Sequence, residues 1–337
     1  MARNSRRSNG MKKIEPSVLT FNFQTTPADN AGQIVSFIDL SQCASLLNRR
    51  FYRQGLNWAV AQIKVIGPND ANIFVSKLPE TWVMSNAWEK GFRAWQKMNN
   101  AALEEAESVK PKFLDFKIYA NSQHHELGFV GNLLPFSDAG VVATAGEWVA
   151  SKFVVPTGGA TSVNDREIIA TGTNYPGASP VTGLNAVSLI EGYAASRGLP
   201  EIVDPNVPAD AADADGLTPE NWMTALFNEG TEQDADVLND MITENNQAPY
   251  PYENDGTAVD TMYPNGANQL SGLQIHDIEA ISSTTIGGIT RMKGGMFPCG
   301  LIKLGFENVA EGTSYAVQID LVPGDHRGYL CEPMTEM

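Results

Sequence analysis

The sequence predicts a mainly β protein whose strands pack as an antiparallel sandwich or barrel, with helices inserted between the strands. Two observations favour this class. Segments in which apolar and polar residues alternate recur along the chain, and turns rich in Gly, Asn and Pro separate them. Long loops and inserted helices argue against a regular βαβ array. The 337 residues, 42% of them hydrophobic, suffice for one large domain or for one domain with a sizeable insertion.

The stretch 45–66 is central to this prediction because it joins a basic turn to a buried strand. The turn contains Arg49, Arg50 and Arg53. In the strand that follows, 57–66, most positions on both faces are apolar or small, which is typical of a central strand covered on two sides. We therefore expect a charged inner surface on a β scaffold.

Other strands are predicted where apolar residues recur at every second position. In chain order these segments are 17–25, 33–40, 72–78, 112–119, 147–155, 166–171, 301–306 and 315–321, with β character from 270 onward and a sharp bend at 293–300. Helical spacing interrupts the strands. A short helix is expected over 41–47, with Ser41 as its N-cap, and another over 185–197.

The longest predicted helix lies within 79–108. Trp88, Phe92 and Trp95 recur there at spacings of three and four residues, which places them on one face. We expect this aromatic face to pack on a sheet. The alternative is that the tryptophans form a platform for a ligand.

Charge is distributed unevenly along the chain. The formal net charge of −16 argues, taken alone, against nucleic acid as a partner. However, the window 198–290 contains seventeen acidic residues and no Lys or Arg, so the negative charge is concentrated there. Residues 1–13 contain five basic residues and no acidic one: Arg3, Arg6, Arg7, Lys12 and Lys13.

This basic N-terminal segment has no apolar periodicity and is expected to be disordered in isolation. One interpretation is a flexible arm that neutralises phosphates without reading bases. The other is a solvated tail. Five charges give modest affinity per chain, so an arm of this kind requires many copies acting together.

Arg49, Arg50 and Arg53 also have two interpretations. They could form salt bridges with the acidic residues of neighbouring loops. Alternatively they line the same surface as the arm, where their guanidinium groups would meet phosphate or the carboxylates of a neighbouring subunit.

The segment 199–268 is rich in Asp, Asn, Pro and Ala and is predicted to be an exposed acidic insertion. Short helical patterns occur in it at 219–228 and 234–245. Asp213 and Asp215 lie in a stretch that partly resembles a calcium loop, but the ligand positions of an EF-hand are not filled. The acidic loops could bind divalent cations weakly, and no other cofactor is expected.

The sequence contains no nucleotide-binding or hydrolase motif. His124 and His125 precede Glu126 without the HExxH order, and we expect them to be loop or exposed residues rather than metal ligands. The three cysteines are interpreted as free thiols in a reducing compartment. No apolar run reaches the roughly 20 residues of a membrane span, and the N-terminus is not a secretory signal.

Four segments resemble capsid proteins of small circular single-stranded DNA viruses that encode a replication initiator, particularly those from aquatic environments. The similar elements are LLNRRFYRQGLNWAVAQI at 46–63, LPETWVMSNAWEKGFRAWQKMN at 78–99, GGMFPCGLIKL at 294–304 and VQIDLVPGDHRGYLCEPM at 317–334. These segments are not catalytic signatures, but they occur in the same order as in the family, which makes the resemblance more specific.

This resemblance implies a single jelly-roll domain, an antiparallel sandwich of eight main strands that self-assembles into an icosahedral shell. The shell domain would comprise 14–198 and 269–337, with 1–13 as a basic arm facing a packaged single-stranded DNA genome. The acidic insertion would face outward, away from the DNA. The implied location is the virion, assembled in the host cell. The host receptor is unknown, and no insertion into a membrane is expected. The arm is shorter than in many relatives.

Two other functions are alternatives. A β-sandwich that binds a carbohydrate or a receptor would present Trp82, Trp88 and Trp95 on an exposed face. A hydrolase on a β scaffold would require a nucleophile and a base, and the sequence offers no such pair. We therefore expect a structural protein rather than an enzyme.

Overall fold

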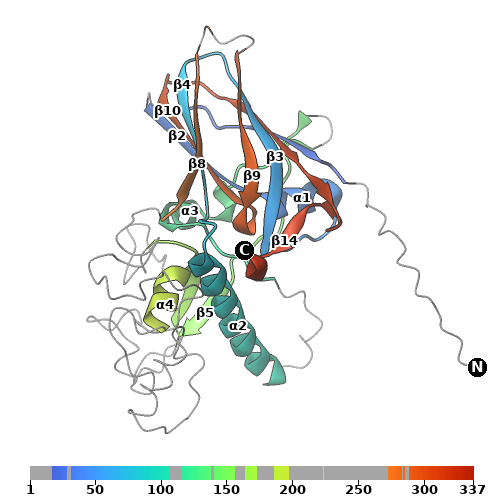
Figure 1. The fold of residues 1–337 in the computed structure, drawn as a ribbon, viewed down its shortest axis with the longest axis vertical. Helices are drawn as coiled ribbons and strands as arrows, with labels where there is room; N and C mark the ends of the chain where they lie inside the picture. Colours follow the sequence, from blue (N-terminus) through green and yellow to red (C-terminus); the bar gives the residue numbers. More distant parts are fainter. Residues whose placement is uncertain are drawn as a thin grey trace, which may run out of the picture.

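The fold is described for residues 17–28, 32–105, 115–137, 140–155, 164–172, 186–196, 223, 272–282, 284 and 288–337 of a computed structural model. It contains more strand than helix, in several sheets that are largely antiparallel and include a curled half-barrel (Figure 1). The basic segment 1–13 and almost all of the acidic segment 199–268 lie outside the described residues. The predictions for Asp213, Asp215 and the two helical patterns therefore stay predictions.

The first large sheet is built around β3 (Leu56–Ile66). β11 (Ala316–Leu321) lies on one side of β3 and pairs in turn with β1 (Thr20–Gln24), while β9 (Ile289–Phe297) lies on the other side. The short strand β14 (Cys331–Pro333) pairs with the first residues of β3. All these pairs are antiparallel.

The second large sheet has the order β2-β10-β4-β8 and is also antiparallel. Its strands are β2 (Gly32–Asp39), β10 (Leu301–Val309), β4 (Ala71–Lys77) and β8 (Gln274–Ile281). Together the two sheets contain eight main strands whose pairing is nested. The first strand in the chain pairs with the eighth, the second with the seventh, the third with the sixth and the fourth with the fifth.

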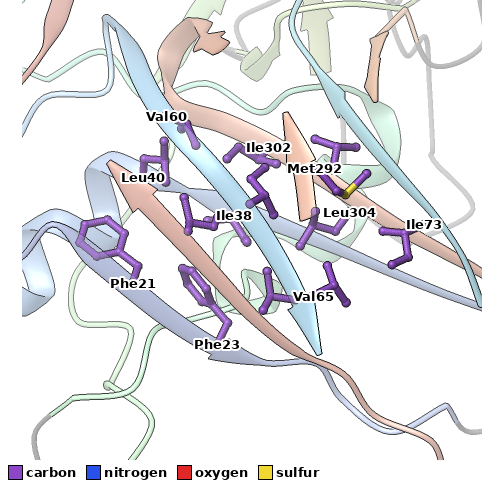
Figure 2. Close-up of a cluster of buried hydrophobic side chains, with 14 of the residues drawn as sticks. Phe21, Phe23, Ile38, Leu40, Val60, Val65, Ile73, Met292, Ile302 and Leu304 are labelled. Atoms are coloured by element: carbon purple, nitrogen blue, oxygen red, sulfur yellow. The ribbon is translucent and has the colours of Figure 1, made fainter. Parts of the chain in front are cut away.

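The main hydrophobic core lies between these two sheets. Alternate residues of β1, β4 and β11 belong to it, as the period of two requires, together with buried residues of the other five main strands. Figure 2 shows side chains from both sheets meeting there: Phe21, Phe23, Val60, Val65 and Met292 from the first, and Ile38, Ile73, Ile302 and Leu304 from the second. Because these side chains are nearly or fully buried, their transfer from water is the main force holding the sheets together.

Most of the described helices and strands between β4 and β8, here called the insertion, lie below the two large sheets in Figure 1. The insertion contains α2 (Trp82–Glu105), α3 (Ser122–Leu127) and α4 (Leu189–Ser196). A small sheet, β5-β6-β7, consists of β5 (Lys152–Val155), β6 (Asn164–Ile169) and β7 (Ala186–Ser188). The pair β6–β7 is parallel.

The expected burial of the aromatic face of α2 is confirmed. Trp88 and Trp95 are only 7% and 9% exposed, and both rings contact Phe116 in the second core cluster. Gly91 allows α4 to approach α2 closely, since a Cβ at this position would lie 2.4 Å from Leu189 Cδ2. Because Trp88 and Trp95 are buried against Phe116, they stabilise the insertion.

Four local predictions need correction. The described part of 112–119 contains only an isolated bridge between Tyr119 and Ile169, because residues 115–118 pair with no strand. The predicted helix 185–197 starts as β7. The predicted bend at 293–300 is confined to 298–300, since β9 continues to Phe297. β3 is covered on both faces only in its first half, since Ala61 and Ile66 are exposed.

We predict that Leu304→Ala destabilises the protein by about 2 to 5 kcal/mol, because it opens a cavity between the two sheets. Leu304 is fully buried in β10. Urea unfolding followed by circular dichroism measures the change. The matched control is Glu307→Ala on the same strand, where the side chain is exposed and the expected change is within about 0.5 kcal/mol. Equal effects of the two substitutions would contradict the placement of the core.

Candidate nucleic-acid interface

The three arginines of the predicted basic turn are exposed at the end of α1 (Leu40–Asn48). Arg49 caps this helix in the left-handed conformation, with φ 52°. Between the arginines the chain is anchored by Tyr52, whose amide donates to Ser45 Oγ at 2.9 Å, and just beyond them by the fully buried Gln54. The anchors fix the turn while Arg49, Arg50 and Arg53 face outward.

The N-terminal part of the described chain lies directly beside this turn. The amide of Val18 donates to Asn48 Oδ1 at 2.9 Å, and Tyr329 Oη donates to the carbonyl of Val18 at 2.6 Å. Asn48 precedes Arg49 in the sequence. Arg3, Arg6, Arg7, Lys12 and Lys13 lie outside the described residues, which begin at Ser17, close to the arginine turn.

Arg327 adds a fourth guanidinium group to the turn. Its side chain is exposed, and its Nη1 donates to the carbonyl of Phe51 at 2.6 Å. The carbonyl of Arg327 in turn accepts from Tyr52 Oη at 3.1 Å. Sequence reasoning missed this residue because it is some 280 positions away in the chain, in a Gly-rich turn with no signal for its partner.

Arg53 also partly fits the salt-bridge interpretation. Burial raises the pKa of Asp115, and the positive charges of Lys117 and Arg53 oppose that rise. Arg53 is therefore close enough to a carboxylate to stabilise it. Its exposed guanidinium still faces solvent.

A buried carboxylate supports the turn from inside. Asp39, rather than the predicted Ser41, is the N-cap of α1 and accepts from the amides of Ser41 and Gln42 at 2.9 and 3.2 Å. Its second oxygen accepts from Gln54 Nε2 at 3.0 Å and from Trp148 Nε1 at 3.1 Å. Burial raises the pKa of Asp39 to about 6, although these hydrogen bonds act in the opposite direction.

The same hydrogen-bond network continues to His124. Gln42 Oε1 accepts from Asn132 Nδ2 at 2.9 Å, and Asn132 Oδ1 lies 2.8 Å from His124 Nε2. His124 Nδ1 accepts from the amide of Ala120 at 3.0 Å, so the proton is on Nε2 and the ring is neutral. Burial lowers the pKa of His124 to about 4, and the ring is stacked on Phe37.

The expectation of loop or exposed histidines is therefore wrong. Both His124 and His125 are buried, in α3, and His125 Nε2 lies 2.9 Å from Glu167 Oε2. The helix has only six residues, which is too short for an apolar period to be recognised in the sequence. Within the described part of the chain, no three His, Cys, Asp or Glu side chains are grouped so that they could hold a metal ion.

Comparison of this chain with protein-family models, with curated protein sequences and with solved structures finds no match. Among the described helices, none combines the length and apolar composition needed to cross a bilayer.

The network predicts two opposite pH responses. The pKa of Asp39 in the folded protein, about 6, exceeds its ordinary value of 3.8, so the contribution of Asp39 to stability grows as the pH falls through 6. The pKa of His124, about 4, is below its ordinary 6.5, so its contribution is lost as the pH falls from 6.5 towards 4. The two contributions largely cancel in the native sequence.

Relative to the native protein, we expect Asp39→Asn to lose about 2 kcal/mol and His124→Gln to gain about 2 kcal/mol between about pH 7 and about pH 4.5. Urea unfolding at the two pH values measures both shifts, and each variant is the control for the other. Acidic residues elsewhere titrate in all three proteins. The test therefore compares each variant with the native protein in how much the free energy of unfolding changes between the two pH values. Parallel pH profiles for the three proteins would contradict the network.

Proposed function

We propose that this protein is a viral capsid subunit, whose two main sheets form a jelly roll and whose copies self-assemble into an icosahedral shell around single-stranded DNA. The observation that carries the proposal is the nested pairing of the eight main strands. Numbered along the chain, their order is 1-8-3-6 in one sheet and 2-7-4-5 in the other. This order supports the proposal, because a long hairpin rolled into the two facing sheets of a jelly roll would have it.

A jelly roll alone does not define a function, since capsid, lectin and cupin domains share it. The arrangement of positive charge favours the capsid. The described chain begins at Ser17, and Val18 lies beside the turn that contains Arg49, Arg50, Arg53 and Arg327. We therefore propose that the cations of 1–13 act at the same end of the sheets as these guanidinium groups. Repeated around closed symmetry, this end would become a dense cationic lining for phosphates.

The burial of Trp88 and Trp95 removes support for a carbohydrate-binding or receptor-binding sandwich with an aromatic platform on α2. Trp82 is itself partly buried against the same core cluster. A platform of three exposed rings is therefore not available on this helix. We propose further that the acidic insertion faces away from the packaged DNA, because like charges would repel.

Electron microscopy and light scattering of the purified full-length protein test the assembly. We expect closed particles of uniform size and copurifying nucleic acid, visible as raised absorbance at about 260 nm because the arms neutralise phosphate. A monodisperse monomer at all protein concentrations and salt conditions would overturn the proposal.

Replacing the five basic residues of 1–13 by Ser tests the arm. Particles should still form, but with less nucleic acid, and the slope of log affinity against log salt for single strands should fall by about 3.5. The matched control exchanges each Arg for Lys and each Lys for Arg, which keeps the charge and should keep the nucleic acid. An unchanged content in the Ser variant would contradict the role of the arm.

A further inference from the structure

Two partly exposed aromatic rings lie at the arginine turn. Phe51 is part of the turn, and Trp148 comes from the insertion. Their ring centroids are 6.4 Å apart, with an angle of 50° between the planes. Lys117 Nζ lies 4.4 Å from the centroid of Trp148 and 5.6 Å from that of Phe51. Three distant parts of the chain thus bring rings and a cation together.

Hydrogen bonds to neighbouring residues fix the position of both aromatic residues. Trp148 donates its indole N–H to the buried carboxylate of Asp39 at 3.1 Å. The carbonyl of Phe51 accepts from Arg327 at 2.6 Å, and Lys117 is held by an ion pair with Asp115 at 3.0 Å. A ligand that meets these rings therefore finds them already ordered, which lowers the entropy cost of binding.

The charge around the rings favours a polyanion. Four exposed arginines surround Phe51: three lie within 49–53, and Arg327 donates to the carbonyl of Phe51. The exposed acidic residues nearest in the sequence to Trp148 and to Arg327 are Glu147 and Asp325. Guanidinium groups bind phosphates with two donors each, and aromatic rings stack on bases whatever their sequence. Single-stranded nucleic acid offers both phosphates and unpaired bases, while a duplex keeps its bases stacked inside.

We propose that Phe51 and Trp148, with Arg49, Arg50, Arg53 and Arg327 around them, form a stacking site for an unpaired nucleobase. The site selects single strands over duplexes and over a bare phosphate backbone. This inference rests on the proposed function, in which the turn faces nucleic acid, and adds to it the chemical group that the rings recognise.

The test uses the full-length protein, dissociated into subunits and freed of nucleic acid so that the arginine turn is accessible. Three fluorescent probes of equal length are compared: oligothymidylate of about 20 nucleotides, the same backbone without bases, and a duplex. Fluorescence anisotropy gives the affinities. We expect oligothymidylate to bind at least about fivefold more tightly than the abasic strand, since stacking on an aromatic ring adds this much or more per base. The basic arm meets the same phosphates in both single strands, so its contribution cancels in the ratio.

Phe51→Leu keeps an apolar side chain but removes the ring, and should bring this ratio close to one. Phe51→Tyr is the matched control and should keep it. Circular dichroism verifies folding, and Phe51→Met replaces the Leu variant if that variant does not fold. Equal affinity of the native protein for thymidylate and abasic strands would overturn the stacking site while leaving phosphate binding intact.

If Phe51→Leu keeps the native ratio of thymidylate affinity to abasic affinity, the role of Phe51 is overturned. Failure to bind any probe would overturn the proposed function as well.

Discussion

The buried carboxylate of Asp39 is the constraint on which the candidate site depends. It ends β2, caps α1 and accepts hydrogen bonds from Gln54 after the arginine turn and from Trp148 in the insertion. A buried charge of this kind is costly unless donors surround it, and every donor here comes from an element that must then stay in place. One side chain thereby holds a helix, a turn and a distant loop in a single arrangement.

The two large sheets supply the scaffold that this network requires. Their nested strand pairs bring the two halves of the chain together, so that Tyr329, near the C-terminus, contacts Val18 and Asn48 near the N-terminus. The insertion between β4 and β8 has a core of its own and contacts the sheets through Phe37, Cys299 and Leu301. The arginine turn lies where sheets, insertion and N-terminal segment meet.

Local pattern predicted much of the scaffold, because strands that face a core on one side keep a period of two. β1, β2, β3, β4 and β11 were predicted within a few residues of their bounds. The polar network was not predictable. Gln54, Asn132 and His124 follow no period, and the contacts of Gln54 with Ile118 and of Asn132 with Gln42 join residues 64 and 90 positions apart. Arg49, Arg50 and Arg53 were predicted as a group because they are clustered within 49–53. Arg327, Lys117 and Trp148 join them only through the fold.

We propose that the basic arm, the arginine turn and the two aromatic rings form one nucleic-acid face. Ultraviolet crosslinking of purified particles, with the crosslinked peptides identified by mass spectrometry, is the decisive test. We expect nucleotide adducts in 1–13 and at Phe51 or Trp148. Adducts confined to the acidic segment 199–268, or to the strands β4 and β8 of the second sheet, would contradict this proposal.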